Sequence, residues 1–208
     1  YTQRADESGK FDFADYMKVA ESINAKVQKG TRANITWENI GPNNVGGRTR
    51  ALIVDRKNSN LLYTGGVTGG IFYSNDAGLT WKNYFNVDSR LEIFAIGSMA
   101  QAINGDIYVG TGNSSESGGT GTESSGGLGN GIYKKAANSD SFVLLTSTFN
   151  PTFSTSNPFA FVNKISTDPK DENLVFAATG NGVKISKDGG QTWINAGAPL
   201  NSGVIYSV

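Results

Sequence analysis

Short apolar runs separated by glycine-rich turns recur along most of this chain, which is the pattern of many short β-strands. Glycine supplies 27 of the 208 residues and aromatic residues 11%, a composition that favours strands and tight turns over helices. We therefore predict an all-β chain. Its clearest strand-like runs are at 60–63, 70–74, 105–110, 131–135 and 173–176.

The first 34 residues follow a different pattern, in which apolar residues recur at the spacing of one helical face. Asp12 is suited to cap the start of such a helix, and Gly30 is suited to end it. We predict an N-terminal helical extension over 1–34 that contains one amphipathic helix. Its apolar positions are Phe13, Tyr16, Met17, Ala20, Ile23 and Val27.

An eight-residue motif, S-x-D-x-G-x-T-W, occurs at 74–81 and again at 186–193, with its tryptophans 112 residues apart. A degenerate copy lies between them, and Phe142 occupies the place of the tryptophan there. The interval therefore holds two repeats of roughly 56 residues, each interpreted as four short strands. Four-stranded repeats of this kind predict the blades of a β-propeller.

We interpret residues 35–208 as part of such a propeller. A Thr-Trp pair at 36–37 repeats the end of the motif, so residues 35–40 are expected to form an outer strand that closes the ring. Three blades cannot close a ring, so we expect the chain to be part of a longer polypeptide. The expected blades are 47–85, 92–146 and 159–197, and a fourth is expected to start within 203–208.

The motif is expected to stabilise the hairpin between the third and fourth strands of a blade. Its aspartate is suited to accept backbone N–H hydrogen bonds, its glycine to take a positive φ, and its tryptophan to pack between blades. A metal site is the alternative, although one carboxylate in a hairpin supplies too few oxygens for Ca²⁺. The structural residues are Ser74, Asp76, Gly78, Thr80, Trp81, Ser186, Asp188, Gly190, Thr192 and Trp193.

The two motifs resemble those of the BNR/Asp-box β-propeller superfamily, which includes sialidases, xyloglucan-active glycosidases, sortilin-type receptors and a photosystem II assembly factor. The stretch 37–52 resembles the opening of large secreted Bacteroidetes propeller proteins that end in a type IX secretion sorting domain. This resemblance implies a bacterial protein exported across the outer membrane, either secreted or displayed at the cell surface. It also implies the secretion machinery as a partner.

The composition excludes several kinds of functional site and partner. The chain has no Cys and no His, which excludes zinc sites built on those ligands, disulfides and Ser-His-Asp triads. Its 18 basic and 18 acidic residues give no positive field for nucleic acid. No apolar stretch approaches the ~20 residues of a membrane span. We expect no metal, no cofactor, no nucleic-acid partner and no transmembrane segment.

The resemblance does not extend to a catalytic site. Xyloglucan-active relatives carry a catalytic aspartate just before a Gly-Gly pair of the first blade, where this chain has Val67. Sialidases carry an arginine in a Phe-Arg-Ile-Pro type motif, where this chain reads Gly-Gly-Arg-Thr-Arg. We therefore assign no catalytic residue, and whether the whole protein is an enzyme stays open.

Two segments supply candidate ligand-binding residues. Arg48 and Arg50 are two positions apart at the start of an innermost strand, so both are expected to face the channel and to suit an anion. A Gly/Ser-rich insertion at 113–130 begins with Asn113, and its charged residues are Glu116 and Glu123. This insertion is either a plain linker-like loop or a flap that orders over a ligand.

Three functions fit these observations. The first is a non-catalytic secreted or cell-surface propeller that binds a glycan or a protein through its top-face loops. The second is a glycoside hydrolase whose catalytic carboxylates lie outside this sequence. The third is a scaffold or assembly propeller, which would present a surface patch in place of a pocket.

Overall fold

The computed structural model describes residues 18, 19, 22, 48–67, 69–84, 95–114, 127–152 and 154–208. The chain divides into two units, Tyr1–Gly47 and Arg48–Val208. In the first unit, Lys18, Val19 and Ser22 are α-helical and exposed, and Ser22 Oγ donates to the Val19 carbonyl at 2.8 Å. The rest of the expected helix and the closing strand at 35–40 lie outside the described residues.

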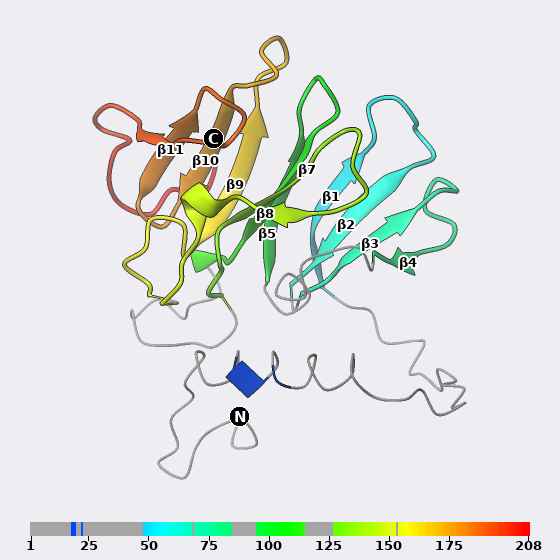
Figure 1. Ribbon diagram of the computed structural model, residues 1–208, viewed down its shortest axis with the longest axis horizontal. Coiled ribbons are helices and arrows are strands. Elements are labelled where there is room, and N and C mark those ends of the chain that lie inside the picture. The colour runs from blue at the N-terminus through cyan, green and yellow to red at the C-terminus, as the bar shows by residue number, and fades with distance from the viewer. Residues whose placement is uncertain are drawn as a thin grey trace. The chain divides into compact units, whose positions relative to one another are not determined.

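The second unit contains three four-stranded antiparallel sheets, which confirms the all-β prediction (Figure 1). In each sheet the strands follow one another in chain order, and β1, β5 and β9, the first strands, lie beside one another with β5 in the middle. Sheet 1 comprises β1 (Thr49–Val54), β2 (Leu62–Gly66), β3 (Ile71–Ser74) and β4 (Lys82–Asn83). Sheet 2 comprises β5 (Ile96–Gln101), β6 (Ile107–Thr111), β7 (Ile132–Lys135) and β8 (Val143–Leu144), followed by the short 3-10 helix η2 (Thr146–Thr148). Sheet 3 comprises β9 (Val162–Thr167), β10 (Val175–Thr179), β11 (Gly182–Ser186) and β12 (Ile194–Asn195).

Sheets 1 and 2 are joined by an apolar cluster that ends in a group of aromatic rings. The Tyr84 ring meets the Phe142 ring edge to face at 5.3 Å, and Tyr84 Oη donates to the Asp140 carbonyl at 2.8 Å. Phe142, which takes the tryptophan's place in the degenerate repeat, is therefore part of this core. The buried members are Ala51, Tyr63, Ile71, Ile96, Met99, Ile107, Val109, Tyr133 and Phe142.

Sheets 2 and 3 are joined by a second apolar cluster and by hydrogen bonds to one turn of sheet 3. Tyr108 Oη and Lys134 Nζ both donate to the Gly189 carbonyl, at 3.1 and 3.2 Å, and Ser147 Oγ donates to the Gly190 carbonyl at 2.9 Å. The Trp193 ring packs on this cluster, 5.4 Å from the Phe159 ring. The buried members are Ala102, Tyr108, Ile132, Phe159, Val162, Ile165, Val175 and Ala177.

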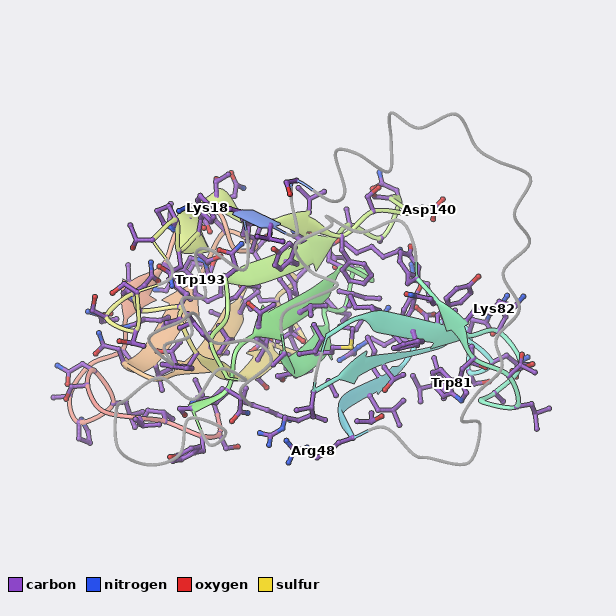
Figure 2. All side chains as sticks on the ribbon, turned by 90° about the horizontal axis from the view of Figure 1, so that it is seen from below. Lys18, Arg48, Trp81, Lys82, Asp140 and Trp193 are labelled. Atoms are coloured by element: carbon purple, nitrogen blue, oxygen red, sulfur yellow. The ribbon has the colours of Figure 1, made fainter. Side chains whose placement is uncertain are left out.

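Sheet 3 packs one of its faces on sheet 2, and the equivalent face of sheet 1 is exposed. Ile165, the fourth residue of β9, is 1% exposed against sheet 2, whereas Leu52, the fourth residue of β1, is 58% exposed. Trp81 departs from the expectation that both motif tryptophans pack between blades, because it is 42% exposed. Figure 2 shows it at the end of sheet 1, beside Lys82. No described sheet lies against this face, so Trp81 has no counterpart of Phe159 within the described residues.

Both motifs form closed hydrogen-bonded turns between the third and fourth strands. In sheet 3, Asp188 Oδ1 accepts from the Thr192 N–H at 2.9 Å and from Ser186 Oγ at 2.8 Å. Ser186 Oγ in turn accepts from the Gly190 N–H at 2.8 Å, and Gly190 has a φ of 94°. The turn of sheet 1 repeats these contacts through Asp76. Each turn is therefore organised around one carboxylate.

These hydrogen bonds stabilise the charged form of each carboxylate. Side-chain hydrogen bonds from Ser74 and Thr80 lower the pKa of Asp76 to about 2. For Asp188, the hydrogen bonds of Thr192 come first, followed by that of Ser186, and they also lower the pKa to about 2. The carboxylates therefore remain charged at neutral pH and are engaged within their own turns.

Replacing Trp193 with alanine is expected to lower the free energy of unfolding by about 3 kcal/mol, since a packed aromatic ring is lost. The same change at Trp81 is expected to cost about 1 kcal/mol, because that ring is largely in contact with water. Chemical denaturation of the full chain, followed by circular dichroism, measures both values. Equal losses for the two variants would contradict the difference in packing.

Because its charged form is stabilised in the fold, Asp188 is expected to make the stability of the protein depend on pH in the acidic range. Its folded-state pKa of about 2 lies below the ordinary 3.8, so its contribution is complete above about pH 4 and is lost as the pH falls toward 2. We expect Asp188→Asn to lower the Tm at pH 6 and to leave it nearly unchanged at pH 2. Asp140→Asn is the control, and a Tm difference of constant size would count against the argument.

Candidate functional site

The first strand of every sheet has a one-residue β-bulge at its second position. In β1, Thr49 pairs with Gly66 and Ala51 pairs with Gly65, which leaves Arg50 as the extra residue. The same shift of register in β5 and β9 leaves Gly97 and Asn163 unpaired. Because a bulge bends its strand and redirects a side chain, three equivalent positions of the repeat are presented in the same way.

The three bulged residues line one cavity of about 350 Å³. It extends across the first strands of all three sheets and is bordered by the C-terminal segment. It thus lies at the edge of the sheets where the expected channel would be. Its lining residues are Arg50, Ala51, Leu52, Gly97, Ser98, Met99, Asn113, Asn163, Lys164 and Tyr206.

Asn163 holds two loops at the border of this cavity. Its Oδ1 accepts from both the N–H and the Oγ of Ser114, each at 2.9 Å, and its Nδ2 donates to the Ile205 carbonyl at 2.7 Å. The Ile205 N–H donates to the Thr179 carbonyl at 3.0 Å. These contacts place Tyr206 on the cavity, where its side chain is 60% exposed. Residues 204–208 form no strand here, so a fourth blade beginning within 203–208 stays a prediction.

The cavity combines two cations with uncharged polar groups. Arg50 and Lys164 are exposed, and Lys164 Nζ makes no hydrogen bond or ion pair with the described part of the chain. The amides of Asn113 and Asn163 are buried in the wall, as is Ser98, whose Oγ accepts from the Ile165 N–H at 3.0 Å. Such a site can donate hydrogen bonds and attract an anion.

Among the residues that the structure describes, this cavity brings together neither a pair of carboxylates nor a group of metal ligands. No carboxylate is among its described lining residues, whereas glycoside hydrolysis ordinarily requires two. Across the described ranges, no group of three or more Asp, Glu, His or Cys residues is placed to hold a metal ion. In the same ranges, no helix is long and apolar enough to cross a membrane.

The structure brings together only some of the predicted ligand-binding residues. Arg50 and Asn113 both line the cavity, but Arg48 does not. Arg48 precedes β1, where its carbonyl accepts from the Val67 N–H at 3.0 Å, and Figure 2 shows it at the surface. The bulge at Arg50 interrupts the alternation on which a shared face depended. Glu116 and Glu123 lie outside the described residues.

Sequence reasoning missed Asn163, Lys164 and Tyr206. For Asn163 a signal existed, because it is the second residue of β9 as Arg50 is of β1, so an alignment of the repeats places the two at one position. Lys164 aligns with Ala51, so the alignment gives no ligand signal for it. Tyr206 had no such signal, since its place depends on hydrogen bonds between Ile205 and two different strands.

No family model and no curated protein matches this chain, but solved structures do. An ancestral GH74 enzyme superposes with a TM-score of 0.56 at 22% identity, over 73% of this chain and 19% of its own. A GH74 xyloglucanase from Xanthomonas campestris gives 0.54 at 17% identity, over 71% and 21%. The extracellular domain of a one-component system from B. thetaiotaomicron gives 0.50 at 17% identity, over 78% and 18%.

These likenesses support a β-propeller fold. At identities this low they show the fold alone, since one fold carries many unrelated sites. The chain spans about a fifth of the length of each of these three structures. The three sheets therefore have the arrangement of propeller blades, and these likenesses specify no ligand for the cavity.

Replacing Asn163 with alanine is expected to release the C-terminal segment, because the tie between its side chain and the Ile205 carbonyl is lost. Hydrogen exchange of a peptide spanning 203–208 should accelerate at least tenfold, while β10 and β11 keep their protection. The exposed Asn138→Ala is the matched control. Unchanged exchange at 203–208 would mean that Asn163 does not hold this segment.

Proposed function

We propose that this chain belongs to a BNR/Asp-box propeller that binds a glycan without cleaving it, at the cavity formed by the three bulged strands. We further propose that the protein is bacterial, and that it is exported by type IX secretion to act outside the cell. The observation that carries the binding role is the cavity itself, which presents amides, a hydroxyl and cations but no described carboxylate.

The size and lining of the cavity suit a carbohydrate. Its volume of about 350 Å³ lies within the range of about 300–1,000 Å³ found for small-ligand sites. The ammonium of Lys164 and the second N–H of the Asn163 amide, beyond the one bonded to the Ile205 carbonyl, can donate to ring hydroxyls. The exposed ring of Tyr206 offers an apolar face against which a sugar ring can stack. A carbohydrate has this combination of hydroxyl edge and apolar face.

Hydrolysis is the alternative function, and it requires carboxylates from outside the described residues. Val67, at the position where the resemblance would place an aspartate, is buried and is not among the lining residues. Binding without turnover therefore requires no catalytic carboxylate from outside the described residues.

The full chain is expected to be retained on at least one immobilised polysaccharide and to release no reducing sugar from it. Tyr206→Ala should weaken that binding at least tenfold, or by about 1.4 kcal/mol, because the stacking surface is lost. Leu79→Ala is the control, since Leu79 is exposed on the turn between β3 and β4.

Two outcomes would overturn this function in different ways. Release of reducing sugar would replace binding with hydrolysis and direct the search to carboxylates elsewhere. Retention on no polysaccharide would remove the glycan and favour a protein partner for the same cavity.

A further inference from the structure

The charge of the cavity goes beyond what a neutral sugar requires. Among the described lining residues two are charged, Arg50 and Lys164, and both are cations. The whole chain is neutral, with 18 basic and 18 acidic residues, so this local excess is not a consequence of overall composition. A concave site lined by one sign of charge raises the local concentration of ligands of the opposite sign.

The two cations come from opposite sides of the site. Arg50 is the bulged residue of β1, and Lys164 directly follows the bulged residue of β9. Between these strands lies β5, which contributes Gly97 and Ser98 to the cavity (Figure 1). Met99 is the third residue that β5 contributes, so the lining of the cavity from this strand is uncharged and the two cations stand on either side of it.

The cation from sheet 3 is available for a ligand. Lys164 is exposed, and its ammonium makes no hydrogen bond or ion pair within the described ranges. Elsewhere in the second unit, Lys134 forms an ion pair of 2.8 Å with Asp106. The charge of Lys134 is therefore engaged within the protein, whereas that of Lys164 is available to a ligand in the cavity.

We propose that the cavity selects a carboxylated sugar, namely a uronic acid residue of an acidic polysaccharide. This inference rests on the proposed glycan-binding function and names the class of glycan. A planar guanidinium matches a carboxylate in a bidentate manner, and the ammonium of Lys164 adds a second charge-assisted contact. The second N–H of the Asn163 amide and the ring of Tyr206 lie at the same cavity, for a hydroxyl and for the face of the sugar ring.

The test compares carboxylated polymers with an esterified, a neutral and a sulfated polymer, and polygalacturonate and its methyl ester are the pair that share one backbone. Binding of the full chain to polygalacturonate and alginate is measured beside the methyl-esterified polygalacturonate, neutral xyloglucan and dextran sulfate. We expect binding to a uronate polymer that falls at least tenfold on esterification and weakens as salt is added. Lys164→Gln and Arg50→Gln should each reduce this binding at least tenfold.

The control variant is Lys187→Gln, which removes the same charge from the exposed turn between β11 and β12 and should bind as the unchanged chain does. Lys164→Gln also guards against misfolding, since its side chain has no described partner to lose. Circular dichroism verifies that each variant is folded.

Every other result overturns the proposal. Equal binding to xyloglucan and to the uronates would refute the selection of a carboxylate and leave glycan binding intact. Binding to dextran sulfate that survives both substitutions would indicate ion exchange over the whole surface. Binding to none of the polymers would refute the proposed function together with this inference.

Discussion

Close approach of the first strands is the constraint on which the three sheets and their cavity depend. A side chain at Gly97 would place its Cβ 2.4 Å from the Val162 carbonyl and 2.5 Å from the Gly112 carbonyl, much too close for any atom. Both obstacles are backbone atoms, so they cannot turn aside. Glycine at this bulge therefore allows β5 to lie against β9.

At the other end of β5, one buried side chain joins the sheets. Gln101 Nε2 donates to Asp55 Oδ2 at 2.7 Å, and Gln101 Oε1 accepts from the Arg56 N–H at 2.9 Å. The Gln101 carbonyl accepts from Thr167 Oγ1 of sheet 3 at 3.0 Å. One residue of sheet 2 thus links both neighbouring sheets. Gln101 thus connects this end of the six-residue strand β5 to both neighbouring sheets, whereas the bulged end of the strand borders the cavity.

The degenerate second repeat stabilises its turn by other means. Where sheets 1 and 3 use the motif aspartate, sheet 2 uses Asp106, which accepts from the Ala137 N–H at 2.9 Å and pairs with Lys134. Lys134 also reaches the Gly189 carbonyl of sheet 3. The change of residues therefore converts a contact confined to one turn into a contact between two sheets, which explains how this repeat can lack the motif and remain a complete four-stranded sheet.

The sequence by itself determined the local structure. Its repeats predicted three groups of strands, and the spacing of the motif predicted turns in which Asp76 and Asp188 accept backbone hydrogen bonds, because these contacts span only four residues. Arg50 and Asn113 were also predicted as ligand-binding candidates. The tertiary structure alone decided which residues share the cavity. A bulge moves Arg50 out of the alternation that paired it with Arg48. Tyr206 is placed by its neighbour Ile205, which accepts a hydrogen bond from β9 and donates one to β10. The packing of Trp193, and the exposure of Trp81 in the same motif, likewise depend on whether another sheet lies opposite, which no local pattern encodes.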